Sequence, residues 1–322
     1  MNNISIIVPT YKRPEYVELC LKSIIGSVGL GSKFEVEVIL SDNSPDDSVA
    51  EVAKKYKDKL DLVFLPEKTP IFVGESRRRG VEKAKNEIII FADSDIELGE
   101  NALSEVIKCI TETPSAGMVT TKVFFKKDDQ IGEVDRPRKE DRMLEIDGVT
   151  YEETNYGRFL CTHRSIFKYL GGYDDVFEKR GEGVDMSCRY WRGGFPIVYC
   201  EKSVVYHHHD APDSLTRLNS GSDRMFASLI LMAYKYDIDA DTSPYFVEVM
   251  NEGKDFQDKK LFDPIHAASS MLDWFNERFD DIKKSKDAIP KEYDFKPQDV
   301  FTKQDLVKKC IAEAPDRIRK LL

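Results

Sequence analysis

The sequence predicts an α/β fold, with a Rossmann-like, mostly parallel sheet flanked by helices and followed by a C-terminal helical extension. Between Ile4 and Ile110, short apolar runs alternate four times with stretches of helical periodicity. That alternation requires a mainly parallel sheet with helices on both faces. Polar or acidic residues follow several of the apolar runs, and long helical patterns begin after Asp210. We therefore divide the chain into an α/β domain, residues 1–210, and a helical segment, residues 211–322.

The four β-α units follow one another directly. Strands are expected at residues 4–8, 34–40, 60–65 and 88–91, each followed by a helix. In the first helix, Pro14 suits the first helical position. Its apolar residues recur at the spacing of one helix face; they are Val17, Leu21, Ile24, Ile25 and Val28.

The pattern changes after the fourth unit. A strand is expected at residues 118–125, and a densely charged stretch, 126–157, predicts a long surface excursion with a hairpin around Asp147-Gly148. Further strands are expected at 159–162 and within 197–206, with a helix between them that starts at Gly181. In the C-terminal segment, helices are expected at about residues 264–284 and 302–321.

Composition and charge restrict the class of function. Charged residues make up 33% and hydrophobic residues 41% of the 322 residues, as in a globular protein. The formal net charge of -10 argues against a nucleic-acid-binding surface. The longest apolar stretch, Phe226 to Tyr234, is too short for a transmembrane segment. No signal segment is recognisable and the cysteines form no C-x-x-C pair, so we expect a cytoplasmic protein.

Two carboxylates mark the end of the fourth predicted strand. Asp93-Ser94-Asp95 follows the apolar run directly. In open α/β sheets, ligands bind outside the carboxyl ends of the strands. A pair of carboxylates there suits a divalent cation that carries phosphates. The alternative is a solvated turn, because Asp-x-Asp alone is a common pattern.

Seven short motifs, in order along residues 1–210, resemble those of the family 2 glycosyltransferases, which have the GT-A fold. The motifs are Ser5-Ile-Ile-Val-Pro-Thr-Tyr-Lys-Arg-Pro14, Val38-Ile-Leu-Ser-Asp-Asn-Ser-Pro-Asp-Asp47, Gly74-x-Ser-Arg-Arg-Arg-Gly80, Phe91-Ala-Asp-Ser-Asp95, Gly171-Gly-Tyr-Asp-Asp175, Gly181-Glu-x-Val-Asp185 and Val205-Tyr-His-His-His209. The resemblance implies a metal-dependent enzyme that transfers a sugar from a nucleoside diphosphate sugar, a UDP- or GDP-sugar, to a hydroxyl acceptor. We expect that acceptor to be a glycan or glycoconjugate.

The resemblance also implies residues that bind the nucleotide. Pro9, Thr10 and Tyr11 match the segment that holds the base and ribose. Asp42 matches a carboxylate that accepts a hydrogen bond from a uracil or guanine N–H; its alternative role is to cap the next helix. Arg77 matches an arginine near the diphosphate.

Arg77 is the first of three consecutive arginines, which cannot all share one helix face. We expect one of them to face the phosphates and the others to be solvated or ion-paired.

Metal binding is implied for the residues next to these. Asp93, with Ser94, matches the ribose-side carboxylate, and Asp95 matches the direct ligand of Mn²⁺ or Mg²⁺. His207 follows a strand end where this fold places a further metal ligand, and imidazole is compatible with Mn²⁺. The alternative for the three consecutive histidines, of which His209 is the last, is a polar strand end.

The catalytic base is the point of departure from the family pattern. Inverting members carry Glu-Asp-x-Asp, whereas this chain has Gly183 at the usual base position. Glu182 and Asp185 are three residues apart and can face the same way at a helix start. We favour Glu182 over Asp185 as the base, and the alternative for Asp185 is an ion pair with Arg189.

Two other functions remain open on the same residues. The missing acid at Gly183 also fits a retaining GT-A transferase, or a catalytically inactive GT-A-like protein that binds nucleotide sugars or glycans. The apolar stripe on the helix after Asp210 fits an interface in a homo-oligomer formed by the C-terminal helices, or an ordinary core helix.

Overall fold

The amino-terminal half alternates strands and helices, as the sequence predicts. The computed structural model describes residues 3–28, 34–67, 69, 71–127, 130–134, 142–155, 157–178, 181–208, 222–238, 273–297 and 299–322. The first strands are β1 (Ile4–Thr10), β2 (Val36–Asp42), β3 (Asp61–Pro66) and β4 (Ile88–Ala92). The helices that follow them are α1 (Pro14–Val28), α2 (Ser48–Tyr56), α3 (Val73–Lys83) and α4 (Ala102–Glu112).

Apolar periodicity explains these elements with two differences in detail. Every residue of β1 is buried, which suits a central parallel strand. On α1 the buried face includes Leu21 and Ile24, but Ile25, which we expected there, is exposed. The second strand runs to Asp42 instead of stopping at Leu40, because β1 and β3 offer it pairing partners on both sides as far as Asp42.

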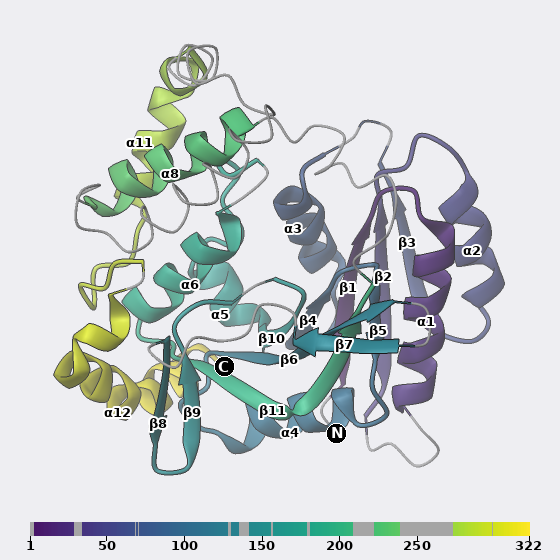
Figure 1. Ribbon diagram of the computed structural model, residues 1–322, viewed down its shortest axis with the longest axis horizontal. Coiled ribbons are helices and arrows are strands. Elements are labelled where there is room, and N and C mark those ends of the chain that lie inside the picture. Colours follow the sequence, from purple (N-terminus) through teal and green to yellow (C-terminus); the bar gives the residue numbers. More distant parts are fainter. Residues whose placement is uncertain are drawn as a thin grey trace.

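The second half of the sheet is mixed. Its strands are β5 (Ile96–Leu98), β6 (Met118–Lys127), β7 (Gln130–Val134), β8 (Met143–Ile146), β9 (Val149–Glu152), β10 (Phe159–His163) and β11 (Ile197–His207). The helices here are α5 (Arg164–Tyr169) and α6 (Glu182–Arg192). The strand order is β3-β2-β1-β4-β10-β6-β11-β9-β8, with β5 paired to β11 and β7 to β6. Figure 1 shows α1 and α2 on one face of the β1–β3 region and α3 on the other.

The order of the strands in the sheet determines which strand ends lie side by side. β1 pairs in parallel with β2 and β4, and Thr10 stands opposite Asp42 in that register. β10 enters between β4 and β6 and runs antiparallel to both. In the charged excursion, β8 and β9 form the predicted hairpin, and its two turn residues Asp147 and Gly148 both have positive φ.

The C-terminal helices pack onto the α/β part. They are α8 (Ser222–Tyr236), α11 (Phe279–Asp287) and α12 (Gln304–Leu321), preceded by a short 3₁₀ turn, η2 (Val300–Thr302). α12 matches the helix predicted at 302–321, whereas residues 264–272 of the other prediction lie outside the described residues. The buried face of α12, including Val307 and Ala314, belongs to the same apolar core as the sheet. No helix in the described segments has the length and apolar character required to cross a membrane.

A separate apolar cluster joins α8 and α11 to α6. Leu231 and Met232 of α8 and Ile282 of α11 pack with Phe177 and Cys188. Figure 1 shows α8 and α11 together, beyond α6 and far from α2. The chain beyond residue 210 therefore shares buried surface with the helix that starts at Glu182. The division at residue 210 remains a prediction from composition.

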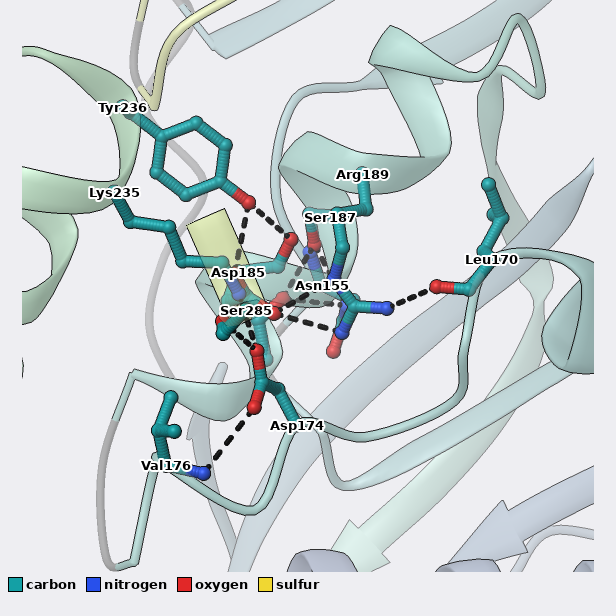
Figure 2. Close-up of polar contacts among 11 residues, drawn as sticks. Asn155, Leu170, Asp174, Val176, Asp185, Ser187, Arg189, Lys235, Tyr236 and Ser285 are labelled. Carbon is teal, nitrogen blue, oxygen red and sulfur yellow. Dashed lines mark hydrogen bonds and ion pairs between the residues drawn. The ribbon is translucent and has the colours of Figure 1, made fainter. Parts of the chain in front are cut away.

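A buried ion network lies beside that cluster (Figure 2). Lys235, on α8 and 2% exposed, places its ammonium 2.5 Å from Asp174 Oδ2 and 2.6 Å from Asp185 Oδ1. Arg189 binds the other oxygen of Asp185 at 2.7 Å, and the Tyr236 hydroxyl donates to Oδ1 at 2.8 Å. Ser285 of α11 donates to Asp174. Two acids and two cations thus compensate one another where three helices meet.

We expect Lys235→Met to destabilise the protein by about 3–5 kcal/mol, because it removes one of the two cations that compensate Asp174 and Asp185. The measurement is the urea midpoint and slope. The matched control is Lys54→Met, which breaks an exposed pair with Glu51 and should leave the midpoint nearly unchanged. If Lys235→Met were as stable as the unsubstituted protein, Lys235 would not be needed to neutralise Asp185.

Candidate functional site

The carboxyl ends of β1, β2 and β4 form one polar edge of the sheet. Thr10 and Asp42 end their strands opposite each other, and Asp93 follows β4 directly. The backbone N–H of Asp93 donates to the carbonyl of Arg158 at 2.9 Å, which ties this edge to the start of β10. Three predicted site residues are therefore brought together by the parallel register alone.

Asp42 is buried and held by its own turn. Ser44 donates to Asp42 Oδ1 from its backbone N–H at 2.9 Å and from its hydroxyl at 2.5 Å. Burial raises the pKa of Asp42, more than the hydrogen bonds from Ser44 lower it. Among the described residues, no donor is recorded on Oδ2. The alternative that we considered, capping of the next helix, is wrong, because the N-cap of α2 is Asp47. Asp42 instead forms a turn through Oδ1, which leaves Oδ2 for a ligand.

The β1–α1 segment lies against this turn. The backbone N–H of Asn43 donates to the Thr10 carbonyl at 2.9 Å, and Thr10 Oγ1 donates to the Lys12 carbonyl at 3.1 Å. Pro9 is buried in the strand, and Tyr11 is half-buried with the Lys12 ammonium 5.5 Å from its ring centroid. The predicted nucleotide-binding residues Pro9, Thr10 and Tyr11 therefore adjoin Asp42.

All three consecutive arginines are ion-paired. Arg77 is 3% exposed and donates to Asp93 Oδ1 at 2.5 Å and to the Gly157 carbonyl at 2.9 Å. Arg78 binds Asp175, and Arg79 binds Glu67 and Glu75.

Burial opposes the charge on Arg77, but Tyr173 and Asp93 outweigh it, so its pKa lies above the usual value. The arginine that we expected at the diphosphate thus holds the predicted ribose-side carboxylate.

Asp95 is flanked by two basic side chains. His207 ends β11, and its pairing with Ile96 of β5 brings its Nε2 to 3.6 Å from Asp95 Oδ1. Arg13 donates to the other oxygen, Oδ2, at 2.7 Å. Burial would raise the pKa of Asp95, but His207, Arg13 and Arg158 more than offset it and lower that pKa.

A carboxylate and an imidazole at this spacing are suitable ligands for Mn²⁺ or Mg²⁺. Within the described ranges, no three His, Cys, Asp or Glu side chains are grouped as a metal cluster. Two protein ligands nevertheless suit a cation whose other positions are filled by phosphate oxygens and water. His208 turns to Glu97 instead, at 3.0 Å, and His209 lies outside the described residues. Asp95 and His207 therefore fit the predicted metal role by chemistry and position.

The two candidate bases lie in different surroundings. Glu182 starts α6 after Gly181, whose φ is 91°, and its charge contributes to the raised pKa of both Arg77 and Tyr173. It therefore lies near enough to Arg77 and Tyr173 to act on both groups electrostatically. Asp185 is fully buried, and its two oxygens are bound by Lys235, Tyr236 and Arg189 (Figure 2). The ion pair with Arg189, our alternative for Asp185, is present.

Gly183 lies in a tight position. A Cβ added there would lie 3.2 Å from Asn155 Oδ1 and 3.4 Å from the Asn155 carbonyl. Asn155 is itself fixed, because its Nδ2 donates to the Gly183 carbonyl at 3.0 Å and to Ser187 Oγ at 2.7 Å. An acid at the usual base position would therefore require Asn155 to move.

Three residues of this site, Arg13, Arg158 and Tyr173, were not predicted from the sequence. Arg13 and Arg158 lie beside Asp95 and Asp93, with Arg158 3.8 Å from Asp93 Oδ2. The Tyr173 hydroxyl accepts a hydrogen bond from Arg77 at 3.3 Å. Arg13 and Tyr173 stand in motifs that we had recognised, but only the folded chain shows which way they point. Arg158 comes at the end of the charged excursion and carried no local signal.

Comparisons with known proteins place the chain among the glycosyltransferases. The chain matches the family model described as "Glycosyl transferase family 2" over residues 5–170. The poly(ribitol-phosphate) beta-glucosyltransferase of Bacillus spizizenii is 32% identical over 102 residues, 31% of this chain and 16% of that protein. The Campylobacter jejuni GalNAc(5)-diNAcBac-PP-undecaprenol beta-1,3-glucosyltransferase is 32% identical over 115 residues, 35% of this chain and 36% of that protein. These matches span well under two thirds of either relative.

Solved structures show the same fold. Staphylococcus aureus TarS 1-349, crystallised with UDP-GlcNAc, aligns with a TM-score of 0.64 at 16% identity, covering 99% of this chain and 90% of that one. GalNAc-T7 with UDP, GalNAc and Mn2+ aligns with a TM-score of 0.57 at 15% identity, covering 71% of this chain and 48% of that one. The fold is GT-A. Because the family model covers residues 5–170 of 322, this chain belongs to glycosyl transferase family 2.

Proposed function

We propose that this protein transfers a sugar from a UDP- or GDP-sugar to a hydroxyl group of a glycan or glycoconjugate, with Mn²⁺ or Mg²⁺ and with inversion at the anomeric carbon. The observation that carries the proposal is the convergence of Asp42, Asp93, Asp95 and His207 at one edge of the sheet. TarS and GalNAc-T7 were crystallised with UDP or UDP-GlcNAc, and the relatives are named for transfer to poly(ribitol-phosphate) and to an undecaprenol-linked glycan. The cytoplasmic location and the homo-oligomer remain predictions.

The positions of the residues support the following roles in donor binding. Asp42 Oδ2 accepts from the ring N–H of the base, and Pro9, Thr10 and Tyr11 line the base and ribose. Asp93, with Ser94, binds the ribose, while Arg77 keeps the Asp93 carboxylate in place through Oδ1. Asp95 and His207 would hold the cation. When bound, that cation neutralises the developing charge of the departing nucleoside diphosphate.

We assign Glu182 as the base that removes the proton from the acceptor hydroxyl. It starts α6, and its charge acts on Arg77, the residue that binds Asp93. Asp185 is less suited to act as the base, because its oxygens are bound to Lys235, Tyr236 and Arg189. A general base must lie within hydrogen-bond reach of the hydroxyl that it deprotonates, and Glu182 is the better placed of the two.

The close packing around Gly183 is compatible with two alternative functions. The usual acid is missing there, and Asn155 occupies its neighbourhood. A retaining transferase or a nucleotide-sugar-binding protein without activity is compatible with that geometry. The anomeric configuration of the product, determined by NMR, separates inversion from retention, and detectable transfer eliminates the inactive alternative.

A thermal-shift screen tests donor recognition directly. We expect UDP- or GDP-sugars with Mn²⁺ to raise the melting temperature, since a ligand at 100 times its Kd adds about 2.7 kcal/mol. An ADP-sugar is the matched control, because adenine has no ring N–H for Asp42 to accept. Stabilisation by the ADP-sugar equal to that by the uridine and guanosine donors would contradict the role of Asp42.

Asp95→Asn should lower the transfer rate about a hundredfold, in the range expected for losing a contact that stabilises developing charge. Initial rates with the donor found in the screen give the measurement. Glu97→Gln is the matched control, since Glu97 lies two residues away but binds Lys126 and His208 instead. A folded Asp95→Asn protein with near-normal rates would remove Asp95 from the cation site.

Glu182→Gln should lower kcat by about 10²–10⁴-fold, the usual contribution of a positioned base, while the Kd of the donor changes little. Single-turnover rates and calorimetric titration of the nucleotide separate these two effects. Asp185→Asn is compared in parallel and should lower stability more than it lowers the rate per folded molecule. Unchanged kcat in Glu182→Gln rules out Glu182 as the base.

A further inference from the structure

The turn between β1 and α1 has an unusual backbone. Lys12 and Arg13 both have positive φ, 59° and 64°, a region that few residues with side chains adopt and that is enriched at functional sites. The turn is held from outside, because the Lys12 N–H donates to Ser44 Oγ at 2.6 Å. Its effect is to turn Arg13 back toward the carboxyl edge of the sheet.

Arg13 binds the carboxylate to which we assign the cation. Its guanidinium donates to Asp95 Oδ2 at 2.7 Å, and both side chains are largely buried, at 13% and 12% exposed. His207 lies at the other oxygen. Arg13 occupies Oδ2, and a cation held by Asp95 and His207 would lie at Oδ1, so the two positive charges would share one carboxylate and repel each other at short range. Metal binding to Asp95 is therefore opposed as long as Arg13 keeps this contact.

The same turn is linked to the base-binding side of the site. Ser44 Oγ accepts a hydrogen bond from the Lys12 N–H and donates one to Asp42 Oδ1 at 2.5 Å. Consecutive hydrogen bonds thus link Asp42 through Ser44 to Lys12. The next residue, Arg13, binds Asp95. A nucleotide that contacts Asp42 adjoins the turn that carries Arg13.

We propose that Arg13 is a gate on the cation site. In the donor-free protein it neutralises Asp95 and opposes binding of a free cation; when the cation arrives with the nucleoside diphosphate, Arg13 exchanges the carboxylate for the diphosphate. A guanidinium suits both partners, because it forms strong, directional hydrogen bonds with carboxylates and phosphates alike. This inference rests on the proposed function, and it makes cation and nucleotide bind cooperatively.

The test compares Arg13→Gln with the unsubstituted protein in two titrations. Mn²⁺ alone is titrated and followed by electron paramagnetic resonance, and UDP or GDP is titrated at saturating Mn²⁺ by calorimetry. We expect Mn²⁺ alone to bind about tenfold more tightly to Arg13→Gln, and the nucleotide about tenfold more weakly, each equivalent to about 1.4 kcal/mol. Arg79→Gln is the matched control, since it removes an arginine paired with Glu67 and Glu75, and should change neither titration.

Several outcomes overturn the gate. Unchanged or weaker binding of Mn²⁺ alone to a folded Arg13→Gln protein shows that Arg13 does not oppose the cation. A nucleotide affinity that does not fall shows that Arg13 does not move to the diphosphate. Both results leave the proposed function standing if Mn²⁺ and nucleotide still bind the unsubstituted protein together. Failure of that protein to bind Mn²⁺ with either nucleotide overturns the proposed function and the gate at once.

Discussion

Charge compensation at the carboxyl edge of the sheet is the constraint on which this site depends. Asp93 and Asp95 are largely enclosed, and an enclosed carboxylate remains ionised only beside positive charge. Arg77 and Arg158 lie beside Asp93, and Arg13 and His207 lie beside Asp95. These four basic side chains come from α3, the start of β10, the β1–α1 turn and the end of β11. The acids and their partners are therefore assembled only in the completed sheet.

The same principle operates on the far side of α6. There Lys235 and Arg189 compensate Asp174 and Asp185, in surroundings closed by the apolar cluster around Leu231 and Ile282. Glu182 stands at the first turn of that helix. The direction in which α6 presents Glu182 thus depends on contacts with α8 and α11 as well as on the sheet.

The local patterns predicted the four β-α units and the strand ends well, because buried parallel strands are continuous apolar runs and their ends are polar. They did not predict that β10 lies antiparallel between β4 and β6, since strand order is a tertiary property. Ile25 was placed on the wrong face because periodicity tolerates a residue at its margin. The turn at Lys12 and Arg13 was invisible, because neither residue type favours positive φ. Asp185 carried a motif position, but its burial depends on Lys235, fifty residues further along the chain.

The position of Lys235 limits how this enzyme can be recombined with its relatives. The family match ends at residue 170, yet the ammonium that neutralises Asp185 comes from residue 235. A chimera that kept α6 and took its C-terminal helices from another family member would keep Arg189 but lose the second cation of the network, unless the substituted helix carried a lysine at the matching place. Asp185 and Lys235 must therefore be exchanged together, although they lie in different parts of the chain.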